Sequence, residues 1–242
     1  MNAHQHALAA TLCALVTVGV AVLAARGSQQ PAAAQPAPAR PPAASLARPA
    51  SPSRAPDAAG FIQRWLLLEP FRVSNQLTES AVQAAVTKYA FARSSMVPRD
   101  GQTVTAGDES AAWHAVDTLG YNVNLFHLAY ALNKPTSNVL FWAVTVVQVP
   151  RDLPGVRLAI GSNAASVWWL DDEEVIALYN DRQAVIDDGV SRRLTLTKGT
   201  HVVRAAIVNA GGATDFCARF IDEDGNPVTG FTLNLAGEGM QR

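Results

Sequence analysis

The sequence predicts an all-β domain, an antiparallel sandwich or barrel with one short helix, behind an N-terminal apolar helix and a disordered linker. Short apolar runs of strand length fill the second half of the chain, and turn-forming residues separate them. Only one segment has helical periodicity. With 242 residues, of which 49% are hydrophobic, the chain can build one sizeable core.

The first residues predict export. The run Ala7–Ala25 carries no charge, and its length lies between the apolar region of a signal peptide and a spanning helix of ~20 residues. We therefore interpret residues 1–30 as a signal peptide or membrane anchor, with cleaved and retained forms both open. Either form places the rest on the periplasmic or extracellular side of the cytoplasmic membrane, anchored or secreted.

The next segment, residues 31–58, has the composition of a tether. Eight of the 14 prolines lie here, and the segment has no glycine. Such a sequence cannot bury a core, so we expect a disordered, extended chain with a reach of up to roughly 85 Å. The β domain should then occupy residues 59–242.

The domain should open with a strand and a helix. Residues 61–68, FIQRWLLL, form an apolar run that ends before Pro70. Residues 76–91 follow, with Thr78 or Ser80 as the helix cap and an apolar stripe on one face. A polar loop should span residues 93–109.

Strand-like runs fill the remainder. Glycine, proline, aspartate and asparagine occupy the turns between them. The runs are residues 111–118, 138–149, 155–161, 165–170, 173–179, 191–197, 201–209, 214–222 and 228–235.

Several pieces, in this order, resemble the jelly-roll, galactose-binding-like domain of many secreted bacterial proteins. That family opens with a Trp-Leu-x-Leu-Gly-Pro-Phe strand, read here at Trp65–Phe71, and continues with a Gly-Ser turn, read at Gly161-Ser162. Its Trp-Leu-Asn-Gly-Glu hairpin corresponds to Trp169–Glu173. A Leu-x-x-Gly turn at Leu196–Gly199 and an Asp-x-Asp-Gly turn at Asp222–Gly225 complete the match.

The resemblance covers about three quarters of the chain and implies a non-catalytic β-sandwich, often linked to carbohydrate recognition. It places four aromatic residues in the core: Trp65, Phe71, Trp169 and Phe216. This chain departs from the pattern at its turns. Glu69 replaces a glycine, and Asp171-Asp172 replaces the Asn-Gly pair.

The stretch VWWLDDEEV, residues 167–175, predicts a β-hairpin. Strand 165–170 should meet residues 173–178 across Asp171-Asp172, because aspartate tolerates positive φ. Strand alternation puts Trp169 on one face and Trp168 on the other. Trp168 then lies either under the second sheet or exposed to a partner.

Four consecutive acids, Asp171, Asp172, Glu173 and Glu174, make this hairpin the leading candidate site. A glycosidase needs two carboxylates that face one substrate, whereas neighbouring residues at a turn point in different directions. We therefore expect a solvated tip that serves recognition, if anything, with Trp168 as apolar anchor.

The sequence gives weak support to nucleophilic catalysis, phosphate binding and calcium binding. His114, His127 and His201 are scattered, and no Gly-x-Ser-x-Gly elbow or phosphate loop occurs. Asp222–Asn226 reads as a turn better than as a calcium loop. We expect no cofactor, metal or catalytic residue. The excess of acids after residue 58 argues against nucleic acid as a partner.

Two functions stay open, with a hydrolase as a remote third. The first is an accessory or scaffolding subunit that docks on a membrane protein complex or another envelope protein. The second is a glycan-binding module of the cell envelope. An exposed apolar patch without a cleft would favour docking. A shallow groove with one or two aromatic residues and planar polar side chains would favour glycan binding.

Overall fold

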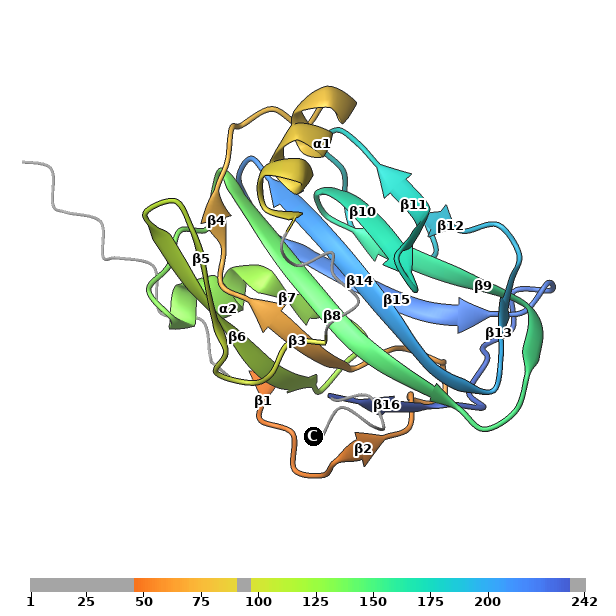
Figure 1. The fold of residues 1–242 in the computed structure, drawn as a ribbon. Coiled ribbons are helices and arrows are strands. Elements are labelled where there is room, and N and C mark those ends of the chain that lie inside the picture. Colours follow the sequence, from red (N-terminus) through yellow and green to blue (C-terminus); the bar gives the residue numbers. More distant parts are fainter. Residues whose placement is uncertain (1–45, 91–96, 236–242) are drawn as a thin grey trace, which may run out of the picture. The chain divides into compact units, whose positions relative to one another are not determined.

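The computed structural model describes residues 46–90 and 97–235, which belong to one compact unit, Pro41–Arg242. The expected signal peptide or anchor and the first half of the expected tether lie outside these residues. Two antiparallel sheets and two short helices make up the described part (Figure 1). The all-β, antiparallel prediction is therefore confirmed.

The larger sheet runs in the order β1-β6-β3-β8-β14-β10-β11. Its path comprises β1 (Leu46–Ala47), β6 (Glu109–Thr118), β3 (Arg64–Leu68), β8 (Val139–Val149), β14 (Gly199–Asn209), β10 (Ala165–Leu170) and β11 (Glu173–Leu178). Four short strands attach beside it: β2 (Ser53–Arg54), β4 (Phe71–Arg72), β5 (Thr103–Ala106) and β16 (Thr232–Asn234).

The smaller sheet runs in the order β12-β9-β15-β7, with β13 also paired to β9. Its strands are β12 (Gly189–Val190), β9 (Leu153–Ser162), β15 (Asp215–Ile221), β7 (Val123–Asn124) and β13 (Leu194–Leu196). Gly161-Ser162 lies inside β9, so the Gly-Ser turn was wrong. The chain turns at residues 163 and 164 instead.

The central strands β8 and β14 are apolar almost throughout because both faces of the large sheet are covered. One core lies between the two sheets. A second core lies between the large sheet and α1 (Glu79–Lys88), to which Val82 and Val86 contribute. Thr78 caps this helix by position, although its side chain accepts no capping hydrogen bond.

The expected core residues Trp65, Phe71, Trp169 and Phe216 are all buried. Trp65 and Phe216 meet edge-to-face between the sheets, with ring centroids 5.1 Å apart. Trp169 packs on the opposite face of the large sheet, with its ring centroid 5.6 Å from that of Trp142.

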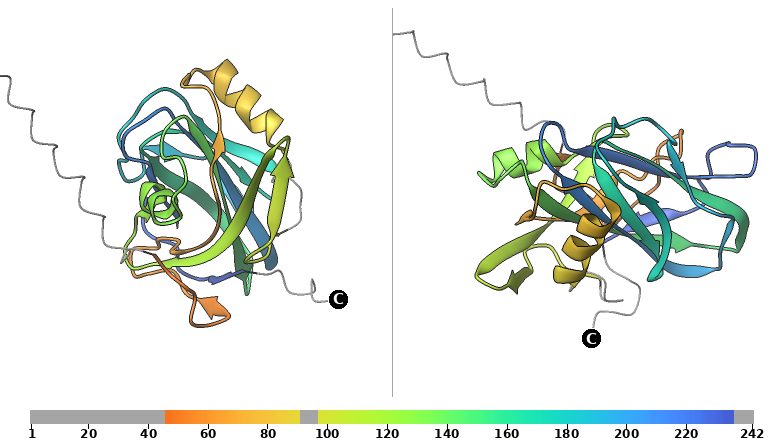
Figure 2. Two further views of the ribbon diagram at one scale, coloured as in Figure 1. Left: turned by 90° about the vertical axis from the view of Figure 1, so that its left-hand side faces the viewer. Right: turned by 90° about the horizontal axis from the view of Figure 1, so that it is seen from above.

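A second helix, α2 (Leu125–Ala131), was not expected. The Asn124 side chain caps it, accepting a hydrogen bond from the His127 amide at 2.7 Å. Leu125 and Leu128 bury its inner face in the core between the sheets, whereas α1 lies on the other core (Figure 2). The loop expected over residues 93–109 also contains β5, which pairs with β6.

The folded unit begins earlier than residue 59. Strand β1 pairs with β6, β2 pairs with β16, and the Arg64 guanidinium donates to the Ser51 carbonyl at 2.9 Å. The domain boundary expected at residues 58 and 59 is therefore too late, because residues 46–58 already supply strands to the large sheet.

Candidate functional site

The hairpin at the leading candidate site forms as expected. Strands β10 and β11 pair antiparallel, with Leu170 opposite Glu173. Asp171 and Asp172 form the turn with positive φ angles of 49° and 69°. Two successive positive φ angles are typical of a tight hairpin turn, which aspartate tolerates better than most residues.

The first acid of the turn is tied into the fold. The Val202 amide donates to Asp171 Oδ1 at 2.8 Å, and the Asp171 amide donates back to the Val202 carbonyl at 3.0 Å. His201 Nδ1 lies 2.5 Å from Asp171 Oδ2. Asp171 therefore locks the turn onto β14 and has little capacity left for a ligand.

The next two acids face cations of the same domain. Asp172 Oδ1 lies 3.7 Å from Nε of the buried Arg204. Burial lowers the pKa of Arg204, and Asp172 opposes that shift. Glu173 pairs with Arg192, with both side chains exposed. These contacts weaken the negative field expected at the tip.

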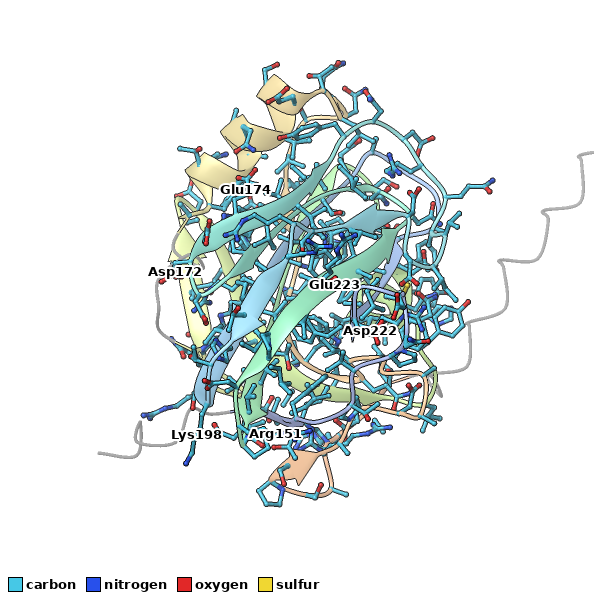
Figure 3. All side chains as sticks on the ribbon, turned by 90° about the vertical axis from the view of Figure 1, so that its right-hand side faces the viewer. Arg151, Asp172, Glu174, Lys198, Asp222 and Glu223 are labelled. Atoms are coloured by element: carbon cyan, nitrogen blue, oxygen red, sulfur yellow. The ribbon has the colours of Figure 1, made fainter. Side chains whose placement is uncertain are left out.

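The fourth acid differs from the others. Glu174 is exposed and makes no ion pair with any residue of the described part (Figure 3). It is thus the one carboxylate of the four that the described chain leaves unneutralised.

Trp168 cannot serve as an exposed anchor. Its side chain is fully buried between the sheets, where its ring lies 5.4 Å from Phe216 and 6.2 Å from Trp65. The indole N–H donates to Ser166 Oγ at 3.0 Å. Alternation assigned the two tryptophans to opposite faces correctly, but β10 is covered on both faces, so the interpretation of Trp168 as an anchor is wrong.

Beside the hairpin lies an open groove of about 450 Å³, which we call the hairpin groove. Two apolar side chains, Leu170 and Leu194, contribute to its lining. Two carboxylates, two guanidinium groups and the Thr195 hydroxyl supply its polar groups. The complete lining comprises Gly155, Leu170, Asp171, Glu173, Arg192, Arg193, Leu194 and Thr195.

A second ion pair involves the lining residue Arg193. Arg193 contacts Glu223 through two nitrogens, Nε at 2.9 Å and Nη2 at 3.1 Å. Arg192, Arg193 and Glu223 were missed at the sequence level. The paired arginines directly before β13 were visible, but only the fold places them opposite Glu173 and Glu223.

The remaining candidates do not assemble into a catalytic group. His201 Nε2 lies 2.8 Å from the Thr197 carbonyl, and His114 Nε2 lies 3.1 Å from Glu69 Oε1. His127 lies on α2. Among residues 46–90 and 97–235, no three His, Cys, Asp or Glu side chains are grouped as metal ligands would be.

The segment Asp222–Asn226 is a turn, as expected. Asp222 Oδ1 accepts hydrogen bonds from the amides of Asn226 at 2.8 Å and Asp224 at 3.0 Å. The hydrogen bond from the Asn226 amide is the largest cause of the lowered pKa of Asp222. Its carboxylate therefore serves the turn.

No family model and no curated protein matches the chain. Among solved structures, the Epithelial Adhesin 9 A domain of Candida glabrata, in complex with Galb1-4GlcNAc, is similar at 12% identity and a TM-score of 0.42. The match covers 78% of this chain and 100% of that one. The PA14 sugar-binding domain from an RTX adhesin matches at 12% identity and a TM-score of 0.38, over 70% and 96%.

A β-glucosidase from Kluyveromyces marxianus, in complex with glucose, matches at 17% identity and a TM-score of 0.37. There the match covers 54% of this chain but only 16% of the enzyme's length. The fuller matches are to sugar-binding β-sandwich domains. At TM-scores below 0.5, however, none of these likenesses transfers a property to this chain.

Proposed function

We propose that this domain is a non-catalytic, extracytoplasmic module that binds a glycan in the hairpin groove. The observation that supports it is the lining of the groove. Asp171 of the hairpin turn and Glu173 of β11 supply two carboxylates, the segment before β13 supplies two guanidinium groups, and two leucines complete the contacts.

The chemistry of these side chains suits hydroxyl groups. A carboxylate accepts through about four lone pairs and a guanidinium carries five N–H donors, so the Glu173–Arg192 and Arg193–Glu223 pairs keep spare hydrogen-bonding capacity. Ion pairs also fix the planes of both groups before a ligand arrives, which lowers the entropy cost of binding. The groove lacks the aromatic residue that we expected of a glycan site, so its apolar contacts come from Leu170 and Leu194.

A glycan array and titration calorimetry test this function. The full chain should bind at least one class among neutral, uronic-acid and amino-sugar glycans. The double variant Glu173→Gln/Arg192→Gln should weaken that binding at least about tenfold, because it removes charge-assisted hydrogen bonds. Its melting temperature should stay near that of the wild type, since an exposed ion pair contributes only ~0–1 kcal/mol.

Lys198→Gln supplies the matched control, because Lys198 is exposed and lies outside the groove lining (Figure 3). Binding that is equally weak in Lys198→Gln and in the double variant would remove the groove from the proposal. A wild-type chain that binds nothing on the array would overturn the glycan function itself.

A second candidate function, docking as an accessory subunit on a membrane complex or another envelope protein, has its own observation. Val185, Ile186 and Val190 expose 55%, 44% and 41% of their surface. Val185 and Ile186 lie in the segment that connects β11 to β12, and Val190 lies in β12. Asp187 fixes this stretch, since it pairs with Arg219 of β15 through two oxygens. Apolar side chains on a fixed support suit a protein partner.

Pull-down of the full chain from membranes in mild detergent separates the two functions. Docking predicts a co-purifying envelope protein that is lost with Val185→Ser/Ile186→Ser and kept with Glu173→Gln/Arg192→Gln. Leu119→Ser, at another exposed apolar residue, is the control. Loss of the partner in all three variants would contradict docking through Val185 and Ile186.

The proposed location rests on the uncharged run Ala7–Ala25. Neither helix among the described residues is long and apolar enough to cross a membrane. An export-dependent reporter fused after Ala58 should be active. An active cytoplasmic reporter in its place would contradict the location.

A further inference from the structure

A separate cavity, here called the α2 cavity, lies at the other edge of the large sheet from the hairpin groove. It is open to solvent on one side and has a volume of about 210 Å³ between β6, α2 and the residues around β1. Strand β6 supplies His114 and Val116, and α2 supplies His127 and Leu128. Leu46, Ala47, Arg48, Asp100, Ala115, Ala131 and Leu132 complete the lining.

Three segments of the chain are hydrogen-bonded to β6 beside this cavity. β5 pairs with β6 over residues 109–112, and β1 pairs with residues 117 and 118. Between them, Asp100 Oδ1 accepts a hydrogen bond from the Ala115 amide at 2.8 Å, in the place of a strand. Leu46 of β1 packs against the core between the sheets. The start of the folded unit is therefore one wall of the cavity.

The acids near the cavity are already engaged. Glu69, the residue that departs from the glycine of the resembled motif, accepts hydrogen bonds from Lys134 at 2.8 Å and from the Ala112 amide at 3.2 Å, and lies 3.1 Å from His114 Nε2. Burial raises the pKa of Glu69, but the hydrogen bonds from Lys134, His114 and Ala112 outweigh it and lower the pKa overall. Glu69 is thus an ionised group that fixes His114.

Arg48 is the one arginine or lysine in the lining of the cavity. It is exposed at the cavity and forms no hydrogen bond or ion pair with another described residue. Asp100, the one carboxylate in the lining, is held by the Ala115 amide. Asp100 makes no ion pair with a described residue and keeps its charge, but its Oδ1 is occupied by the amide, whereas the Arg48 guanidinium keeps all its N–H donors for an anion.

The volume of the cavity and its apolar lining indicate the size and the non-polar part of the ligand. An engineered apolar cavity of ~150 Å³ in another protein holds benzene, so about 210 Å³ suits a ring-sized molecule with one polar substituent. Val116, Leu128 and Leu132 offer apolar contacts, and the two imidazoles are planar. We propose that the α2 cavity binds a small, ring-sized carboxylate, with Arg48 at the carboxylate and the apolar side chains around the ring.

Benzoate is the probe, with benzyl alcohol as its neutral counterpart. In amide NMR spectra of the full chain in mild detergent, benzoate should cause saturable shifts at Val116 and Leu128. Benzyl alcohol should bind about tenfold more weakly, and Arg48→Gln should weaken benzoate to a similar degree, because each loses a charge-assisted hydrogen bond. Arg151→Gln, at an exposed arginine outside the cavity, should leave binding unchanged.

Ala131→Trp supplies an independent check, because Ala131 is an exposed residue in the cavity lining. The larger side chain should block binding of both probes. Absence of saturable benzoate shifts at Val116 and Leu128 in the wild type would overturn the proposal. Equal affinity for benzyl alcohol, or an Arg48→Gln variant that binds like the wild type, would overturn the role of Arg48.

Discussion

Replacing Gly161 by alanine should loosen the segment that crosses the small sheet between β11 and β12. A Cβ at position 161 would lie 2.2 Å from the Val185 carbonyl oxygen, 2.9 Å from the Val185 carbonyl carbon and 3.1 Å from Cys217 Sγ. The first two contacts are to backbone. The Val185 segment would therefore have to move by roughly 1 Å to restore ordinary contact, because a rotamer change cannot relieve the clash.

The magnitude follows from opposing effects. Alanine restricts the unfolded chain, which stabilises by ~0.4–1 kcal/mol. Overpacking in a filled site costs ~1–3 kcal/mol, and displacing Val185 also strains the neighbouring Asp187–Arg219 pair. We expect a net loss of about 1–3 kcal/mol, which lowers Tm by roughly 3–9 °C for a domain of this size.

Cys217 reports the local change. Its side chain is buried beneath this segment, and burial raises the pKa of its thiol to about 11. In Gly161→Ala the thiol should react faster with a disulfide reagent at pH 8, since access and the thiolate fraction both increase. Gly120→Ala is the control, because an added Cβ there has no heavy atom within 4 Å. Wild-type Tm and an unchanged thiol rate in Gly161→Ala would refute the packing of Val185 on Gly161.

Other predictions concern stability and boundaries. The pKa of the Cys217 thiol is raised from its ordinary value of 9.0 to about 11 in the folded state, so the folded state loses stability as pH rises from 9 to 11. In urea unfolding, the wild type should therefore lose about 2 kcal/mol relative to Cys217→Ala over this pH range. Asp171→Ala should lower the free energy of unfolding in urea by about 2–3 kcal/mol, because it removes the hydrogen-bond partner of Val202 and His201 and leaves alanine at positive φ. Glu174→Ala should change the same free energy by under ~0.5 kcal/mol. Equal losses of stability in Asp171→Ala and Glu174→Ala would contradict the hydrogen bonds from β14 to Asp171. Trp168→Ala should cost ~3–5 kcal/mol in the same assay; a neutral effect would place its ring outside the core. Limited proteolysis should leave a core that starts near Leu46, because β1 and β2 are paired in the large sheet. A core that starts at residue 61 would show that β1 and β2 do not pair stably with β6 and β16.

The sequence predicted the hairpin well because its signals are local. Apolar runs define β10 and β11, and two aspartates tolerate the positive φ angles between them. Helix α2 was missed because seven residues are too few for a clear stripe, and because its cap comes from a single side chain, Asn124. Strands β1 and β2 have two residues each and lie in a proline-rich composition, so no periodicity marks them.

The site was harder to predict than the fold because its partners are remote in sequence. Glu173 meets Arg192 of the segment before β13, and Asp172 meets Arg204 of β14. Four acids in a row looked like a strong negative field, yet their neutralisation depends on strand order. Likewise, alternation gave the faces of β10 but could not show that Trp168 lies under a second sheet.

Pairing of β1 with β6 fixes where the described chain enters the domain. Because the folded unit already includes Leu46, residues 46–58 of the expected tether belong to the domain. The chain enters at β1, and β11 is six strand spacings away, about 29 Å along the sheet. An attachment on the N-terminal side of β1 and a ligand at the hairpin would therefore act on opposite edges of the large sheet.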